Sequence, residues 1–312
     1  MAHVSVRVLV TGANSFSARF LLPVLAARAD VEMVATTDVQ PDGPAETEYV
    51  AAQIEDARAM REVLATARPD IVFHLAGVAS HDAALCFAVN VDGTRHLLDA
   101  CAAHSAQTRV LLVSSAALYG LTRPDETPVT ELTPLRPITA YGASKAAAEL
   151  YALSMHRRGA LRATVIRPFN LLGPGLRPGM APSDFVAQAV AIRDGHAAPE
   201  LHVGNLEPRR DFLDIRDAVD AYVRLAFRDD VGAETFNVAT GVPVAVGDLL
   251  RMILDAAGVE ARIVLDPARQ RAVEVMEQVG DATKLRTLTG WTPQHALRQT
   301  LVHMVAAESP RA

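Results

Sequence analysis

The chain has 312 residues, of which 50% are hydrophobic and 21% are charged, so it is long enough to bury one large core and a smaller second one. The formal net charge is -6 and the basic residues are spread along the whole length, which excludes a chain-wide field that favours nucleic acid or an anionic membrane. The two cysteines, Cys86 and Cys101, are too few for a disulfide framework, and neither has a Cys or His at metal-ligand spacing, so we expect no metal site. No signal-peptide pattern and no unbroken apolar run of ~18 residues is found, which predicts a cytoplasmic protein.

Short β-branched runs alternate with amphipathic stretches through the first half of the chain. The expected strands are Val4–Val10, Val31–Thr37, Ile71–Leu75, Arg109–Ser114 and Ala163–Arg167, and the expected helices are Ser15–Arg28, Asp56–Ala67, Val89–Ala103 and Tyr141–Arg157. This alternation is typical of parallel strands joined by crossover helices, and each strand is too apolar to have a face in water. The sequence therefore predicts an α/β fold with a doubly wound parallel sheet of the Rossmann type.

The alternation stops after Asn170, where a loop rich in glycine and proline begins and shorter elements follow. We expect residues 1–170 to form a dinucleotide-binding domain and residues 171–312 to form a smaller, mostly helical substrate-binding lobe. A strand-like run at Glu234–Val238 indicates that the chain returns to the large sheet. The segment from Met180 to Phe185 is expected to be an irregular loop, which either covers a bound substrate or is an ordinary connection.

A small-residue turn, Val10-Thr11-Gly12-Ala13-Asn14-Ser15-Phe16-Ser17-Ala18, joins the first strand to the first helix. Such a turn lets backbone N–H groups and the positive end of a helix approach a pyrophosphate. The usual fingerprint has three glycines, and here Ser15 and Ala18 replace two of them, although the Ser15 hydroxyl could donate to a phosphate. Asp38 ends the second strand 26 residues after Gly12, where a carboxylate accepts hydrogen bonds from a ribose and repels a 2′-phosphate. The alternative is an ordinary strand-to-helix turn with an ordinary strand-end carboxylate.

Tyr141 and Lys145 are four positions apart on an expected helix, and Ser115 follows the strand Arg109–Ser114. Positions i and i+4 share one helix face, so the phenol and the ammonium project together toward the carboxyl edge of the sheet. A nearby positive charge favours the phenolate and lowers the phenol pKa from its ordinary value of ~10. The three residues together predict a site for proton transfer.

In this order the residues resemble the extended short-chain dehydrogenase/reductase superfamily, in its nucleotide-sugar epimerase, dehydratase and reductase branch. The resemblance covers nearly the whole chain. Other matching segments are His74-Leu75-Ala76-Gly77, Asn90-Val91-Asp92-Gly93-Thr94, residues 114–120, Arg167-Pro168-Phe169-Asn170, Gly173-Pro174-Gly175, residues 204–214 and residues 280–291. The distal segments are most similar to the GDP-4-keto-6-deoxy-D-mannose reductases, which make GDP-6-deoxy sugars.

The resemblance implies a role for each matching residue. Tyr141 is the acid/base, Lys145 binds the nicotinamide ribose, and Ser115 binds the reacting oxygen. The implied cofactor-binding residues are Gly12, Asn14, Ser15, Phe16, Asp38, Ile54, Leu75, Ala76, Gly77, Asn90 and Lys145, and Asp38 favours NAD(H) over NADP(H). The implied substrate-binding residues are Ser115, Asn170, Arg210 and Arg271.

Arginine offers a planar fork of donors that suits a diphosphate. The alternative for Arg210 is a surface ion pair with Asp214. Arg271 is followed by Ala272, where the family usually has a proline.

Dehydratases of this branch have an acidic residue two positions before the residue that matches Tyr119. This chain has Ala117 there, and its neighbour Ala116 is also unable to move a proton. Three hypotheses remain. The first is a reductase of a nucleotide-linked 4-keto-6-deoxyhexose, with GDP as the expected nucleotide. The others are an NAD-dependent 4-epimerase of nucleotide sugars and a non-catalytic dinucleotide-binding sensor. The resemblance also implies a homodimer formed by the helices Val89–Ala103 and Tyr141–Arg157, whose apolar faces could instead be internal.

Overall fold

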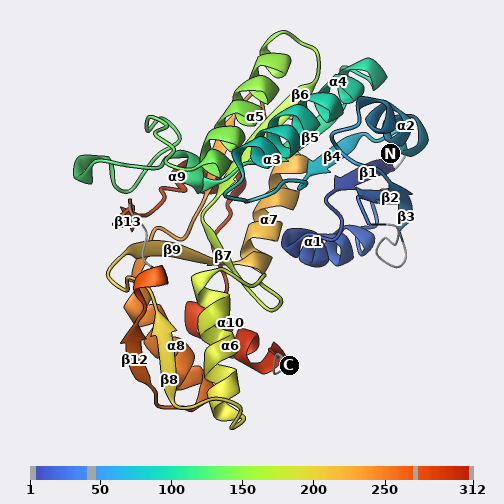
Figure 1. Ribbon diagram of the computed structural model, residues 1–312. Coiled ribbons are helices and arrows are strands. Elements are labelled where there is room, and N and C mark those ends of the chain that lie inside the picture. The colour runs from blue at the N-terminus through green and yellow to red at the C-terminus, as the bar shows by residue number, and fades with distance from the viewer. Residues whose placement is uncertain (1–4, 41–46, 270–272, 309–312) are drawn as a thin grey trace.

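A parallel sheet of seven strands, in the order β10-β6-β5-β4-β1-β2-β3, forms the centre of the larger lobe of the computed structural model (Figure 1). The model describes residues 5–40, 47–269 and 273–308. The strands are β1 (Val6–Thr11), β2 (Val31–Asp38), β3 (Glu48–Ala51), β4 (Ile71–His74), β5 (Arg109–Val113), β6 (Arg162–Pro168) and β10 (Thr235–Val238). Neighbouring strands all pair in parallel. The strand order reverses between β1 and β4, which is where doubly wound sheets bind ligands. The predicted Rossmann-type fold is confirmed.

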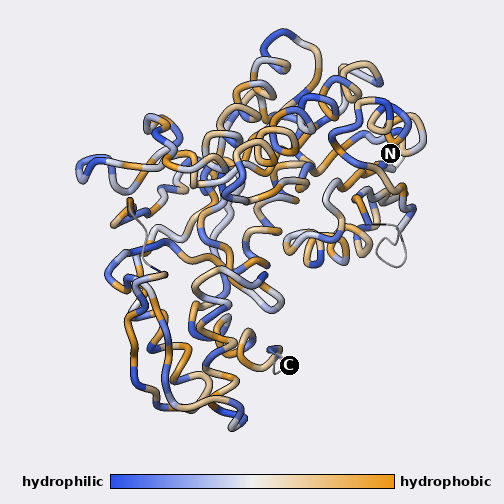
Figure 2. Tube along the Cα trace, in the orientation of Figure 1, coloured by the Kyte–Doolittle hydropathy of each residue, from blue (hydrophilic) through white to orange (hydrophobic). Residues whose placement is uncertain are grey.

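Helices cover both faces of this sheet. They are α1 (Phe16–Ala26) and α7 (Ile215–Ala226) on one face, and α2 (Ala57–Ala67), α4 (Thr94–His104) and α5 (Ala140–Arg157) on the other. Successive residues of β1 point to opposite layers, because Val8 and Val10 join the first cluster and Leu9 joins the second. The central strands are hydrophobic along much of their length (Figure 2), as expected for a sheet that is buried on both faces.

Several element boundaries differ from those expected from the sequence. Ser15 and Asp56 lie just before their helices, because each side chain accepts a hydrogen bond from the first turn and caps it. The helix expected at Val89–Ala103 is divided into a π-helical turn, η1 (Ala88–Gly93), and α4. The short strand β3 and the helix α3 (Ala83–Phe87) were not expected. Val4, the first residue of the first expected strand, lies outside the described residues.

The smaller lobe is built on three helices, α6 (Ala181–Arg193), α8 (Val246–Ala257) and α10 (Leu297–Ala307), which share one apolar cluster. It also contains two small sheets, made of β7 (Asn170–Leu172), β9 (Arg209–Asp214), β11 (Pro243–Ala245) and β13 (Glu277–Gln278), and of β8 (Glu200–Val203) and β12 (Arg262–Leu265). The expectation of a loop from Met180 to Phe185 is wrong, since only Met180 precedes α6. Pro182 fits there because the first turn of a helix does not need its N–H.

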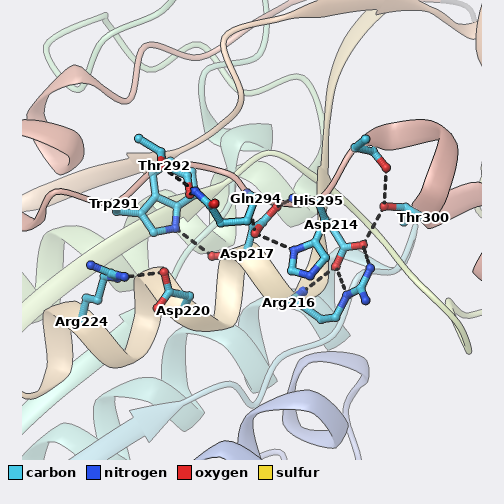
Figure 3. A network of polar contacts seen from close by, with 11 residues as sticks. Asp214, Arg216, Asp217, Asp220, Arg224, Trp291, Thr292, Gln294, His295 and Thr300 are labelled. Atoms are coloured by element: carbon cyan, nitrogen blue, oxygen red, sulfur yellow. Dashed lines mark hydrogen bonds and ion pairs between the residues drawn. The ribbon is translucent and has the colours of Figure 1, made fainter.

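The chain after residue 170 contributes to both lobes. Strand β10 pairs with β6, as the run at Glu234–Val238 indicated. Helix α7 is tied to the segment before α10 by the network in Figure 3. The Asp217 carboxylate accepts the backbone N–H groups of Gln294 and His295 at 3.0 Å each, and the Asp217 carbonyl accepts the indole N–H of Trp291 at 3.0 Å. The smaller lobe is therefore fixed to a helix that packs on the large sheet.

Candidate active site

The turn after β1 lies across the ends of three strands. Gly12 has φ +69°, and its N–H donates to the Thr37 carbonyl of β2 at 2.9 Å. A β-carbon at Gly12 would lie 2.7 Å from the backbone nitrogen of Ala76, which follows β4, and Leu75 N donates to Thr11 O at 3.2 Å. Glycine is therefore required at position 12 both by the backbone conformation and by the close approach of a neighbouring strand.

The N-terminus of α1 begins directly after this turn. The Ser15 hydroxyl accepts the Ala18 N–H at 3.3 Å, so it caps the helix in addition to any contact with a phosphate. The N–H groups of Phe16 and Ser17 are in the first turn, where a helix offers no internal acceptor. The positive end of α1 is therefore presented at the switch point of the sheet, which suits a pyrophosphate.

Asp38 lies against the same turn. One of its carboxylate oxygens accepts the Asn14 N–H at 3.0 Å and the other accepts the Val39 N–H at 2.7 Å. Within the described part of the chain, the buried side-chain Nδ2 of Asn14 has no hydrogen-bond partner. An unpaired buried donor beside a glycine turn fits a site that a ligand completes, and the residues present therefore fit a dinucleotide.

Ser115 and Tyr141 are brought together by the start of α5. Thr139 caps this helix by accepting the Gly142 N–H at 3.0 Å, and a β-carbon at Gly142 would lie 2.7 Å from the Ala117 carbonyl oxygen. The helix can therefore press against the short turn that follows Ser115. In this position the Ser115 side chain lies close enough to the Tyr141 hydroxyl to act on its pKa.

Burial raises the pKa of Tyr141, although the Ser115 side chain and the positive charge of Arg177 act in the opposite direction. The expectation of a lowered pKa is therefore wrong, because the loss of solvation outweighs the nearby charge. A phenol with a raised pKa keeps its proton at neutral pH and is suited to donate it. Arg177, from the loop between β7 and α6, was not identified from the sequence, since a cation in a Gly/Pro loop follows no pattern.

Lys145 is 5% exposed and lies beside Gly77 and Asn90. A β-carbon at Gly77 would be 3.5 Å from Lys145 Nζ and 3.0 Å from Asn90 Oδ1. Burial lowers the pKa of Lys145 to about 8, and the negative charge of Glu149 opposes this change. Asn90 is held in the π-helical turn by the Val78 N–H, which donates to its Oδ1 at 2.8 Å, and by its own Nδ2, which donates to Ser144 Oγ at 2.9 Å.

His74 joins the glycine turn to the Asn90 turn. Its Nδ1 lies 2.7 Å from Thr11 Oγ1 and its Nε2 lies 2.9 Å from Thr94 Oγ1. Burial lowers the pKa of His74 to about 3, so the ring is neutral. The Thr94 hydroxyl donates to the Asn90 carbonyl at 2.6 Å, so it must accept from His74, which places the ring proton on Nε2. The sequence identified His74 only as part of a matching motif.

Ile54 lies on the other side of the Asn90 turn. It is 7% exposed, and its Cγ2 would be 2.6 Å from a β-carbon at Gly93. Gly93 therefore leaves the space that Ile54 occupies beside the Asn90 turn.

On the side of the smaller lobe, β7 pairs with β9 and brings Asn170 close to the Arg210 strand. Asn170 Nδ2 donates to the Asp211 carbonyl at 2.9 Å. Arg210 is half-buried, and its Nη1 donates to the carbonyl of Arg209 at 2.9 Å. Asp214, the alternative partner of Arg210, instead binds the guanidinium of its neighbour Arg216. Arg271 lies outside the described residues.

Gln278 connects this strand to the Ser115 turn. It pairs with Arg210 in the β13–β9 register, and its Nε2 donates to the Ala116 carbonyl at 2.9 Å. The two contact partners are 162 positions apart, so no local sequence signal could have identified Gln278. The contact brings β9, the strand that carries Arg210, next to Ser115 and Tyr141.

Among the described residues, no three His, Cys, Asp or Glu side chains form a group that could hold a metal ion. None of their helices is both long and apolar enough to span a bilayer.

Residues 8–239 match the model of the NAD dependent epimerase/dehydratase family. The chain is 35% identical over 238 residues to GDP-6-deoxy-D-mannose reductase of Pseudomonas aeruginosa, a match that covers 75% of this chain and 78% of that protein. It is 31% identical over 315 residues to UDP-glucose 4-epimerase of Mycolicibacterium smegmatis, covering 96% and 97% of the two proteins. The solved structure of RMD from Pseudomonas aeruginosa complexed with NADPH has a TM-score of 0.84 and 28% identity, and the match covers 97% of this chain and 98% of that chain.

Proposed function

Because the chain belongs to the NAD dependent epimerase/dehydratase family and is an enzyme of the extended short-chain dehydrogenase/reductase type, we propose that it reduces the C4 ketone of a GDP-linked 4-keto-6-deoxyhexose. The contact between Ser115 and Tyr141, next to a turn whose residues Ala116 and Ala117 cannot move a proton, carries this proposal. A proton donor beside a turn with no acid or base at positions 116 and 117 suits ketone reduction and does not suit dehydration. The similarity to GDP-6-deoxy-D-mannose reductase supports the choice of nucleotide and sugar.

In this mechanism Ser115 and Tyr141 both donate hydrogen bonds to the C4 oxygen of the sugar. The nicotinamide, when bound, supplies the hydride that reduces C4. The raised pKa of Tyr141 keeps its proton in place until negative charge forms on the C4 oxygen, and the proton then passes from the phenol to that oxygen. Lys145, whose pKa is about 8, is mostly charged at neutral pH, so it can hold the ribose hydroxyls and stabilise the phenolate that remains.

The residues around the glycine turn would hold the dinucleotide. Asp38 would accept hydrogen bonds from the adenine ribose and repel a 2′-phosphate, which favours NAD(H) over NADP(H). The other proposed cofactor contacts are Gly12, Asn14, Ser15, Phe16, Ile54, Leu75, Ala76, Gly77 and Asn90. Asn170 and Arg210 would hold the substrate diphosphate, together with Arg271.

A second candidate is a 4-epimerase of nucleotide sugars. The UDP-glucose 4-epimerase of Mycolicibacterium smegmatis is matched over 96% of this chain, and the same Ser115, Tyr141 and Lys145 would be sufficient for that reaction. The sensor hypothesis is the weakest of the three, because it gives no reason for the complete set of three residues.

We also propose a homodimer. Apolar side chains are exposed on α5 at Leu150 (57%) and on the adjacent α3 at Leu85 (42%) and Phe87 (43%). A second copy of the chain would cover them, as the sequence resemblance implies for α4 and α5. The cytoplasmic location stays a prediction.

The function is tested by replacing the proton donor while keeping its ring. Tyr141→Phe is expected to lower turnover by ~10²–10⁴-fold and to leave dinucleotide binding unchanged. Tyr151→Phe is the matched control, since Tyr151 lies on the same helix and its hydroxyl donates to Asp99 at 2.5 Å, away from Ser115. Turnover near the wild-type level in Tyr141→Phe would remove Tyr141 from the mechanism.

The wild-type protein is assayed with a panel of GDP-, dTDP- and UDP-linked sugars, with mass spectrometry of the products and absorbance of the reduced cofactor. The reductase consumes one reduced cofactor for each ketone that is reduced. Interconversion of two sugars without net cofactor oxidation would instead establish the epimerase. Conversion of only dTDP- or UDP-linked ketones would correct the proposed nucleotide.

A further inference from the structure

A buried ion pair lies one helical turn beyond Lys145, and the proposed reaction uses neither of its members. Glu149 on α5 is 1% exposed and Arg167 on β6 is 5% exposed. Arg167 Nε donates to Glu149 Oε2 at 3.1 Å, and Arg167 Nη2 donates to the other carboxylate oxygen. This fork fixes the carboxylate in one orientation. Replacing such a pair by apolar residues is often neutral or stabilising, so stability alone gives a weak reason for its presence.

Two more hydrogen bonds tie Arg167 to neighbouring residues. Its Nη1 donates to the Tyr119 hydroxyl at 2.8 Å and to the Glu131 carbonyl at 3.2 Å, and the Tyr119 hydroxyl donates to Asn237 Oδ1 at 2.6 Å. Burial raises the pKa of Tyr119 to about 12, so this phenol is neutral at physiological pH. Glu149 is therefore the carboxylate that pairs directly with Arg167, and the Glu131 carboxylate accepts the Asn237 N–H at 2.7 Å further along the same network.

The groups around Lys145 carry little charge of their own. His74 on β4 is neutral, and Asn90 on η1 presents an amide. On α5 itself, Tyr141 keeps its proton because its pKa is raised, and Cys86 of α3, a buried free cysteine, acts on Tyr141. Of these described residues, Glu149 is the one whose negative charge acts on Lys145.

We propose that Glu149 is a positioning residue that keeps the Lys145 ammonium charged inside a site from which water is excluded. Positions 145 and 149 share one face of α5. Both side chains are buried, where charges interact more strongly than they do in water. Arg167 in turn holds the Glu149 carboxylate in place through the fork of hydrogen bonds. The use of the Lys145 charge in catalysis rests on the proposed function, whereas the electrostatic effect on Lys145 does not.

The sequence allows this effect to be measured without cofactor or substrate. The chain has two lysines, Lys145 and Lys284, so protein with ¹³C-labelled lysine side chains gives two Cε signals in an NMR titration. Lys284 forms its own ion pair with Glu234 and serves as the internal reference. In Glu149→Gln, we expect the Lys145 midpoint to fall by about one pH unit while the Lys284 midpoint is unchanged. The alkaline limb of the kcat/KM profile should move in the same direction.

Two controls separate charge from structure. Glu149→Asp keeps the negative charge and should restore most of the Lys145 midpoint. Tyr119→Phe removes a hydrogen bond from the same network without removing a charge, so it should leave the midpoint where it is. If Tyr119→Phe lowers the midpoint as far as Glu149→Gln does, the effect is structural and the proposal is wrong.

Glu149→Gln leaves Arg167 buried without a counter-ion and can fail to fold. The double variant Glu149→Leu with Arg167→Met removes both charges and leaves an apolar pair in their place. Because Glu149 shares a face of α5 with Lys145 whereas Arg167 lies beyond it on β6, the midpoint should still fall. A midpoint within about 0.2 of the wild type in this variant would overturn the proposal. A wild-type protein that turns over no nucleotide sugar but shows the expected midpoints would overturn the proposed function alone.

Discussion

A methyl group added at Gly12 tests the glycine turn against a matched position elsewhere in the chain. Gly12 and Gly258, which ends α8, both have φ +69°, so alanine at either position costs about 1–2 kcal/mol of backbone strain. The added carbon at Gly258 meets nothing within 4 Å, whereas at Gly12 it would lie 2.7 Å from the nitrogen and 2.8 Å from the Cα of Ala76. These are backbone atoms that cannot rotate away, so the turn or the segment after β4 must move.

Overpacking of this kind costs about 1–3 kcal/mol, so the free energy of unfolding should fall by about 1–2 kcal/mol in Gly258→Ala and by about 2–5 kcal/mol in Gly12→Ala. Urea unfolding measures both values. Dinucleotide titration should show wild-type affinity for Gly258→Ala and at least about tenfold weaker binding for Gly12→Ala, because the displaced turn no longer presents its N–H groups. Equal losses of stability in the two variants would refute the close contact. Unchanged dinucleotide affinity in Gly12→Ala would show that the Gly12 turn does not bind the cofactor.

Three further variants address the cofactor, the substrate and the link between the lobes. Asp38→Ala should narrow the preference for NAD(H) over NADP(H), and tighter NADPH binding by the wild type in the same titration would contradict the role of the carboxylate. Arg210→Ala should weaken nucleoside diphosphate by ~1.5–3 kcal/mol, measured by calorimetry, whereas Arg209→Ala, which loses an exposed ion pair with Glu277, should bind normally. Burial would raise the pKa of Asp214, but the hydrogen bonds that it accepts hold it below its ordinary value. Asp214→Asn should therefore lose ~1–3 kcal/mol of stability at neutral pH, and the difference from wild type in urea unfolding should shrink as the pH falls below about 4.

The large sheet could be predicted because its strands consist mostly of apolar residues, and this composition alone indicates that they are buried. Val8, Leu9 and Val10 are each 0% exposed, and such a run needs no distant information to be recognised as a strand buried on both faces. Strand β3 and helix α3 span four and five residues, which is too short for a periodic pattern. The small sheets of the second lobe depend on pairings between distant segments, which single-sequence patterns do not encode.

The same division holds for the candidate site. Tyr141 and Lys145 are related by helical spacing, and Ser115 follows a clear strand, so these three could be named from the sequence. Gln278 reaches the Ser115 turn from a segment 162 positions away, and its contact depends on the tertiary fold. The direction of the pKa change at Tyr141 was also beyond the sequence, because it depends on how much water the fold removes from the phenol.

That direction fits the proposed reductase. A reductase begins with a protonated phenol and gives its proton to the C4 oxygen, so a raised Tyr141 pKa preserves the form with which the reaction starts. A 4-epimerase begins by removing the proton from a C4 hydroxyl, which requires the phenolate that burial disfavours. Once the phenol has donated its proton, the phenolate and the Lys145 ammonium form a buried pair, and each charge favours the other. Lys145 thus stabilises the product of proton donation, which is also the phenolate that a 4-epimerase would start from, so the cofactor balance of the assay, and not α5, decides between the two candidates.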